Sequence, residues 1–293
     1  MNVQLLISGI SLGSVYALIA VGFAIVFSIL KFSNFAHGGM ISLCAYLGYF
    51  FQRSFEQPPP IFVTILFTAV CGVVVAIVVD TIAYRRIRAK GAPNIYYFLA
   101  SITVAILIQQ ILSVFYGKNL YGYPPIFEST TYFIGSIRFS SIDTLIMLVA
   151  LALLAVLIIL IEKTRIGLAI RAVAIDAKTS RLMGMNSNLI ILAVFVMAGF
   201  LAGVSGVLLG LKYMAYPALG SSMMIKGFIA SVIGGLGSLS GAIIAAILLG
   251  IIEILLTYHL SSLATPIILF GIMLIFLFVR PEGISGKFAK DKV

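Results

Sequence analysis

The sequence predicts an all-α protein that crosses a membrane several times, and its composition and apolar runs are the reasons. Of the 293 residues, 62% are hydrophobic and 10% are charged, and the mean hydropathy is +1.20. Soluble domains carry about 25% charged residues, so a soluble globular domain is excluded. Apolar runs near the roughly 20 residues that a helix needs to cross the hydrocarbon core cover most of the chain. We therefore expect a polytopic helical membrane protein.

About eight hydrophobic segments account for this coverage, and residues 1–293 form a single transmembrane domain in this interpretation. The first run has no basic region before it and is too long for a typical signal peptide, so we expect an uncleaved span. Each of the others is long and apolar enough to enter the bilayer. The segments lie at about residues 4–29, 37–52, 61–82, 94–116, 141–161, 188–211, 224–257 and 263–280.

Basic residues next to these segments set the expected orientation. Cytoplasmic loops carry an excess of lysine and arginine, so all three basic clusters should lie in the cytoplasm. Residues 120–140, residues 212–222 and the N-terminus then lie outside, and the tail, residues 281–293, lies inside. The clusters are Arg85, Arg86, Arg88 and Lys90; Lys163, Arg165, Arg171, Lys178 and Arg181; and Arg280, Lys287, Lys290 and Lys292. Asp80, close to the first cluster, should form a local ion pair.

This orientation requires residues 224–257 to enter the membrane and return on the same side. Residues 234–241, with the sequence GGLGSLSG, supply the turn, because clustered glycines weaken a helix. Transporters build substrate sites at such broken helices, where protein or a watery cavity satisfies the free backbone groups. The alternative is that these glycines only let helices pack closely. A weaker break is expected at residues 31–39.

Residues 162–187 form a polar segment between apolar spans and predict a cytoplasmic helix to which another protein docks. Ile166, Ile170, Val173 and Ala177 recur at spacings of four, three and four, so they should share one face of a short helix. Gly184 is expected to stop it. An ordinary positively charged loop is the alternative.

Within the spans, polar side chains are costly and often functional. Gln109 and Gln110 lie near the middle of theirs and point in different directions, so at least one should face the interior. Hydrogen bonding between helices is the alternative role for each. Glu253 and His259 fit either a functional role or an exposed position at the level of the lipid headgroups.

Several functions are excluded or disfavoured. The chain has no G-x-x-x-x-G-K-[ST] phosphate loop, so it does not hydrolyse ATP by that route. Catalytic constellations and zinc spacings are also missing, so we expect no catalytic, cofactor-binding or metal-binding residues. The net charge of +10 reflects membrane orientation rather than nucleic-acid binding. Cys44 and Cys71 should be small buried hydrophobes.

The residues resemble one known family over nearly the whole chain: the LivH-type membrane permease subunits of high-affinity branched-chain amino-acid ABC importers. The stretches that carry the likeness are residues 9–18 (GISLGSVYAL), 34–38 (NFAHG), 165–186 and 234–241, with the tail RPEG at 280–283. Their order and spacing make the likeness specific. Gly39 departs from the pattern, because the family commonly has an acidic residue there, and a function tied to that carboxylate is not carried over.

The resemblance implies an inner-membrane permease of a bacterium, with a cytoplasmic C-terminus, that moves aliphatic amino acids by alternating access. Its expected partners are a second homologous permease subunit in a heterodimer, an extracytoplasmic amino-acid-binding protein, and two cytoplasmic ATPases that bind the ATP and magnesium. The ATPase contact is expected at Ile166, Ile170, Arg171, Val173, Ala177, Arg181 and Gly184. The pathway is expected at Ser11, Ser14, Asn34, Gln109, Gly234, Gly235, Gly237, Ser238 and Ser240.

Two alternatives stay open at this point. Related permeases carry urea, short amides and other small solutes, so the substrate is less specified than the class of transporter. A stand-alone channel or secondary carrier would fit the physics of the spans, and it would move solute without ATP.

Overall fold

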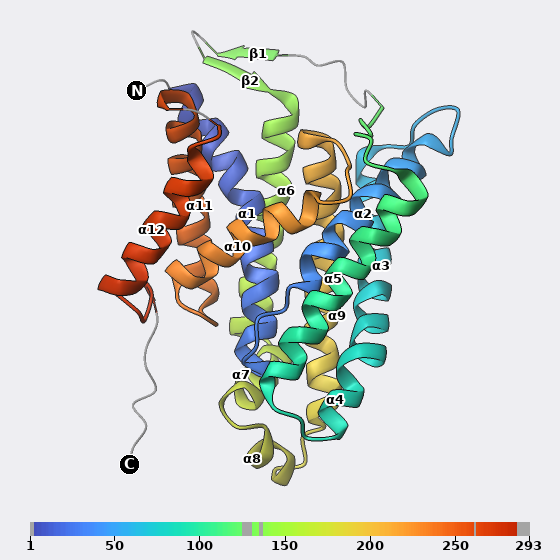
Figure 1. Cartoon of the computed structure of the whole chain (residues 1–293), viewed down its shortest axis with the longest axis vertical. Helices are drawn as coiled ribbons and strands as arrows, with labels where there is room; N and C mark the ends of the chain where they lie inside the picture. Colours follow the sequence, from blue (N-terminus) through green and yellow to red (C-terminus); the bar gives the residue numbers. More distant parts are fainter. Residues whose placement is uncertain (1–2, 125–130, 135–136, 261, 286–293) are drawn as a thin grey trace.

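The structure is a computed structural model that describes residues 3–124, 131–134, 137–260 and 262–285 (Figure 1). Helices dominate the described residues, as expected, and an antiparallel hairpin at one end is the departure. The helices are α1 (Val3–Leu30), α2 (Ala36–Arg53), α3 (Ile61–Val79), the π-helix η1 (Asp80–Tyr84), α4 (Arg85–Ala89), α5 (Asn94–Tyr116), α6 (Ser141–Lys163), α7 (Arg165–Ile175), α8 (Ala177–Leu182), α9 (Ser187–Tyr213), α10 (Leu219–Gly234), α11 (Leu239–His259) and α12 (Thr265–Val279). The strands are β1 (Thr131–Ile134) and β2 (Ile137–Ser140).

The predicted segments correspond to helices with small boundary differences. Among the described residues, six helical stretches are long and apolar enough to cross a membrane: α1, α3 continued through η1 and α4, α5, α6, α9 and α11. The helices α10 and α12 are shorter. Helix α10 begins at Leu219, before the expected residue 224, and the stretch from α3 through α4 ends at Ala89, after the expected residue 82. The chain is therefore a polytopic helical membrane protein, whose count of full crossings is not fixed by helix length.

Helix α1 forms the centre of the bundle and is buried from Leu12 to Val26. It packs against α6, α9, α10 and α11. Glycines make the α1–α11 contact close: a Cβ atom on Gly13 would lie 2.7 Å from the Cα of Ile247, and one on Gly250 would lie 2.3 Å from the backbone of Gly13. Small residues let helix backbones approach in this way, and dispersion forces then hold the helices together in lipid.

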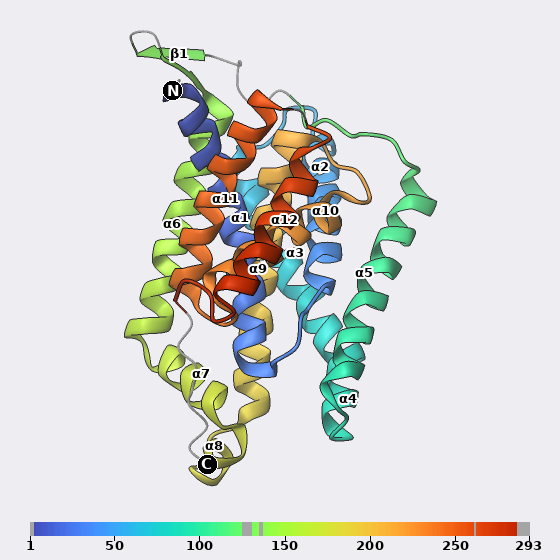
Figure 2. The ribbon, with the colours of Figure 1, turned by 60° about the vertical axis from the view of Figure 1, so that its left-hand side comes forward.

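A second glycine contact joins α3 to α9, which pack antiparallel. A Cβ atom on Gly199 would lie 2.4 Å from the carbonyl oxygen of Gly72, and one on Gly203 would lie 2.2 Å from that of Thr68. These two pairs fix the register of α3 against α9 over their whole length. In Figure 2, α3 and α9 lie between α6 on one side of the bundle and α5 on the other.

The predicted break at residues 234–241 is confirmed as the turn between α10 and α11, which form a V (Figure 1). Gly235 and Gly237 have φ of 105° and 91°, a conformation that favours glycine. Ser238 caps α11 by accepting a hydrogen bond from the amide of Gly241 at 3.3 Å. Close packing operates here too, because a Cβ atom on Gly234 would lie 2.4 Å from the amide nitrogen of Ala242.

The chain after α12 returns to this turn and completes it. The amides of Ile284 and Ser285 donate hydrogen bonds to the carbonyl oxygens of Ile233 and Gly234, at 2.9 and 3.1 Å. These carbonyls end α10 and would otherwise lack intrahelical donors. The tail therefore satisfies the backbone groups that the broken helix leaves free.

The two ends of the bundle differ in charge. The basic cluster of residues 85–90 and the basic segment of residues 163–181 share the end that carries α4, α7 and α8, while the hairpin and the start of α1 lie at the opposite end (Figure 1). This arrangement agrees with the expected orientation. Lys287, Lys290 and Lys292, in the third cluster, lie outside the described residues.

The α3–α9 contact generates a prediction about one methyl group. Gly199→Ala places a methyl group against the carbonyl oxygen of Gly72, so overpacking should lower the free energy of unfolding by roughly 1–3 kcal/mol. Gly271→Ala in α12 is the matched control, because a Cβ atom there meets open space. The control should be neutral or stabilising by up to about 1 kcal/mol. Unfolding in mixed micelles measures both, and equal effects would contradict the packing argument.

Candidate functional site

A cavity of about 300 Å³ lies between α5 and α10, beside the start of α2. Its lining is apolar except for Gln109 on α5 and Ser221 on α10. The Oγ of Ser221 donates a hydrogen bond to Oε1 of Gln109 at 3.1 Å, so the two polar groups meet across the gap between the helices. The other lining residues are Phe35, Phe98, Ile102, Ala105, Ile106, Met224 and Ile225.

This lining suits a small solute with an apolar body and a polar end. Small-molecule sites are mostly apolar, with a few placed polar groups that fix orientation. The amide of Gln109 and the hydroxyl of Ser221 both donate and accept hydrogen bonds. No side chain that lines the described cavity carries a charge. The site can therefore hold a neutral or zwitterionic molecule without a fixed counter-ion.

The sequence analysis expected at least one of the two adjacent glutamines to face the interior, and Gln109 does. Gln109 is half-buried and lines the cavity, whereas Gln110 is exposed. Ser221 was not predicted. The available signal was a pair of serines, Ser221 and Ser222, inside what proves to be the first turn of α10.

The other predicted pathway residues do not gather at this cavity. Ser11 and Ser14 are buried in α1, where Ser11 donates to Asp143 at 3.0 Å and Ser14 donates to the carbonyl of Ser11 at 2.7 Å. The side-chain oxygen of Asn34 accepts a hydrogen bond from the hydroxyl of Tyr84 at 2.7 Å. These three side chains therefore use their polar atoms within the protein.

The remaining predicted pathway residues lie at the α10–α11 turn: Gly234, Gly235, Gly237, Ser238 and Ser240. A Cβ atom on Gly237 would lie 3.6 Å from Ser28, near the end of α1. The turn therefore lies toward one end of the bundle, next to the tail, and not beside Gln109. Ser238 acts as a helix cap, and Ser240 is exposed. A role for this turn in a pathway stays a prediction.

The polar segment folds into two helices, so the prediction of one short helix is wrong. Asp176 separates α7 from α8, with φ of −152° and ψ of 108°. Its carboxylate accepts a hydrogen bond from the amide of Thr179 at 3.3 Å, the geometry of a helix cap. Thr164 caps α7 in the same way, through the amide of Gly167 at 3.2 Å. Aspartate at this position therefore ends one helix and starts the next.

The face expected to bind another protein also needs correction. Ile170 and Val173 are 3% and 2% exposed because they hold α7 against the bundle, while Ile166 is 57% exposed and Ala177 is half-buried. The four residues therefore do not share one face. Ile170 and Val173 are therefore not available for direct contact with another protein.

The basic and glycine positions of this segment have separate roles. The guanidinium of Arg171 donates to the carbonyl oxygen of Ile161, and Arg181 is exposed. Gly184 has φ of 83° and follows α8, and the amide of Met185 donates to the carbonyl of Ser180 at 3.1 Å. Gly184 is thus confirmed as a helix stop.

Sequence reasoning missed the apolar residues that this segment does expose. Leu168, Ile175, Leu182 and Met183 are 60–88% exposed at the end of the bundle that carries α4. Clustered exposed apolar side chains mark sites of protein interaction. The signal was present as hydrophobic residues within a polar segment, but these four residues were not among those predicted.

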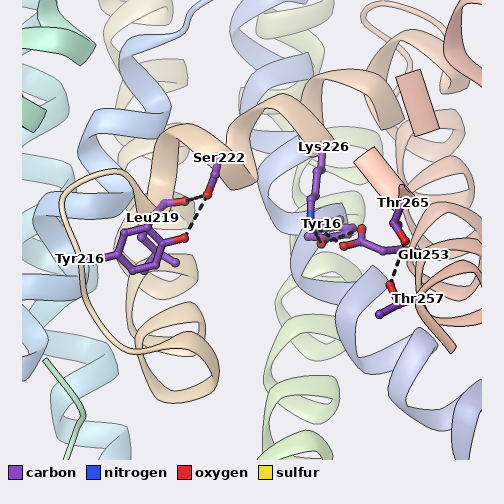
Figure 3. A network of polar contacts seen from close by, with 8 residues as sticks. All are labelled: Tyr16, Tyr216, Leu219, Ser222, Lys226, Glu253, Thr257 and Thr265. Atoms are coloured by element: carbon purple, nitrogen blue, oxygen red, sulfur yellow. Dashed lines mark hydrogen bonds and ion pairs between the residues drawn. The ribbon is translucent and has the colours of Figure 1, made fainter. Parts of the chain in front are cut away.

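A buried charge network is the second feature that the sequence did not predict (Figure 3). Nζ of Lys226 on α10 lies 2.5 Å from Oε1 of Glu253 on α11 and donates to the hydroxyl of Tyr16 on α1 at 2.9 Å. That hydroxyl donates to Oε2 of Glu253 at 3.0 Å. Glu253 is 8% exposed and therefore not at an exposed headgroup position. The network ties both arms of the V to the central helix.

Asp80 forms the local ion pair that was expected, with Arg88 at 2.9 and 3.2 Å. The π-helical turn between them explains the spacing of eight residues. One inserted residue rotates Arg88 back onto the face of Asp80, which an uninterrupted α-helix would not do.

Comparisons with known proteins agree with this architecture. Residues 5–278 match the sequence model of a family described as branched-chain amino acid transport system / permease component. LivH of Escherichia coli strain K12, a high-affinity branched-chain amino acid transport system permease protein, is 33% identical, with 99% of this chain and 97% of LivH covered. BraD of Pseudomonas aeruginosa, with the same description, is 31% identical at the same coverage. The solved structure of PsaBC from Streptococcus pneumoniae in complex with Fab shares the fold, with a TM-score of 0.52, 15% identity, and 95% and 91% of the two chains covered.

The charge network generates a prediction with an internal control. Lys226→Met leaves Glu253 buried without its partner, so the free energy of unfolding should fall by about 3 kcal/mol. The double variant Lys226→Met/Glu253→Leu removes both charges and should recover most of that loss. Unfolding of the purified chain in mixed micelles gives both values. Additive losses in the double variant would mean that the two side chains are not coupled.

Proposed function

The chain belongs to the family of permease components of branched-chain amino acid transport systems, and from this premise we propose that it carries aliphatic amino acids across the cytoplasmic membrane through the cavity at Gln109. The cavity is the observation that carries the proposal. Its apolar lining matches a branched side chain, with about 0.8 kcal/mol gained for each buried methylene. Gln109 and Ser221 supply neutral groups for the ammonium and carboxylate of the zwitterion.

The position of the cavity suggests how it opens and closes. Gln109 and Ser221 lie on α5 and α10, which are far apart in the chain, and a single hydrogen bond of 3.1 Å joins them. Helix α10 is one arm of the V, and its far end is held by the tail at residues 284–285. Movement of this arm against α5 would exchange the Ser221–Gln109 bond for bonds to the solute. This exchange fits alternating access at a broken helix.

Energy for this movement must come from partner chains in the proposal. The sequence has no phosphate loop, and the exposed residues Leu168, Ile175, Leu182 and Met183 offer a site for one of the two cytoplasmic ATPases to act on. A second homologous permease subunit would complete the membrane unit, and a solute-binding protein would dock at the opposite end. The end with α4, α7 and α8 is cytoplasmic in this proposal, and a cytoplasmic C-terminus stays a prediction.

The alternatives are distinguished by two experiments. Urea and short amides lack the apolar body that the cavity lining fits, so they should not compete with leucine for uptake, whereas isoleucine and valine should. A stand-alone channel or carrier would move leucine in liposomes without ATP. Flux that requires the partner ATPases and nucleotide supports the importer, and flux without them contradicts it.

Gln109→Leu tests the substrate site directly. It removes a hydrogen-bond partner of a charged group, which is worth about 1.5–3 kcal/mol, so leucine uptake should fall at least about tenfold at limiting leucine. Gln110→Leu is the control, because the same change is made on the exposed face of the same helix. Uptake of labelled leucine by cells with all transport components measures both. Equal loss in the two variants would remove Gln109 from the site.

Leu182→Asp tests the docking surface. A charge in place of a side chain that is 87% exposed should leave the fold intact and reduce copurification of the ATPase severalfold, because it would be buried unpaired in the contact. Leu120→Asp is the matched control at the opposite end, where the leucine is 63% exposed. ATPase recovered with the tagged permease is the measurement. Normal recovery with Leu182→Asp would place the contact elsewhere.

A further inference from the structure

A second cavity, of about 410 Å³, lies between the end of α3, α4 and the start of α9, and it is independent of the transport site. Its lining changes in character along the helices. Ile77, Leu189 and Leu192 are apolar, and the others are polar or charged: Asp80, Thr81, Arg85, Arg88, Asn186 and Asn188.

The register of α3 against α9 shows that the apolar lining residues form one half of the cavity and the polar lining residues form the other. The contacts Gly72–Gly199 and Thr68–Gly203 run antiparallel. Continued toward α4, the same register brings Ile77 near Leu192 and then Arg85 near Asn186. The apolar half therefore lies within the bundle's membrane-spanning part, and the polar half lies at the end that carries the basic clusters.

The polar half of the lining carries positive charge that its single carboxylate does not neutralise. Two arginines and one aspartate leave one net positive charge in the lining. Arg88 pairs with Asp80 through both terminal nitrogens, and its Nε is buried with no partner among the described residues. Arg85 is exposed, and its guanidinium has no hydrogen bond or ion pair within the part of the chain that the structure describes. The first turn of α9, after Asn186, adds the positive end of a long helix dipole.

We propose that this cavity binds the phosphodiester headgroup of an anionic phospholipid, with Arg85 and Arg88 on the phosphate and an acyl chain along Ile77, Leu189 and Leu192. A phosphodiester carries one negative charge, which matches the net charge of the lining. Arginine pairs with phosphate through several parallel donors. A soluble phosphate would leave the apolar half unfilled, so the graded lining favours a lipid of the leaflet on the α4 side.

Native mass spectrometry of the full chain, purified in detergent and titrated with dioleoyl phosphatidylglycerol, tests this proposal. Arg85→Gln should weaken the first binding step about tenfold, since it removes a charge-assisted bond. Arg86→Gln is the matched control, because Arg86 makes the same charge change one residue away and does not line the cavity. It should weaken binding by less than about twofold, with both variants melting at the wild-type temperature.

Three results would overturn the proposal. Equal weakening by Arg85→Gln and Arg86→Gln would mean diffuse attraction to the basic cluster. If the first molecule of dioleoyl phosphatidylcholine bound as tightly as the first molecule of dioleoyl phosphatidylglycerol, the cavity would not recognise the charge of the headgroup. Full displacement of the lipid by soluble sn-glycerol 1-phosphate would assign the cavity to a free phosphate instead.

Discussion

Close approach of helix backbones at glycine is the constraint on which this structure depends. Lipid gives helices no hydrophobic reason to associate, so they are held by packing, and packing is best where no side chain intervenes. Gly13 and Gly250 set α11 against α1, and Gly72 and Gly199 set α9 against α3. The α3–α9 contacts also set the register that orders the lining of the second cavity, between α3, α4 and α9.

At the break between α10 and α11, segments that are distant in the chain satisfy backbone groups that the membrane cannot. Ending α10 at Gly234 frees carbonyl groups that lipid cannot satisfy. The tail at residues 284–285 supplies the missing donors, and the Tyr16–Lys226–Glu253 network holds both arms of the V to the central helix. Helix α10 is therefore joined to the tail at its far end and to the central helix at Lys226, while its first turn meets α5 through the Ser221–Gln109 hydrogen bond.

The segment between α6 and α9 shows why a periodic pattern predicted a helix but selected residues that are partly buried. The apolar spacing of residues 166–177 predicted one helix, but Asp176 satisfies the next turn with its own carboxylate and ends α7. Ile170 and Val173 fit the period because they are core residues. Apolar residues at helical spacing mark the buried side of a helix. The side left for a partner is the other one, where exposed apolar residues such as Leu182 fall outside that spacing.

The sequence by itself determined the class of the protein, the positions of its spans, the glycine break and the family, because apolar length, charge asymmetry and clustered glycines are local properties. It also indicated Gln109. Only the tertiary structure decided that Ser221 meets Gln109, that Lys226 pairs with Glu253, and that Ser11, Ser14 and Asn34 use their polar atoms internally. Those facts depend on the rotation and depth of helices far apart in the chain, which are set by mutual packing and leave no signal within any one segment.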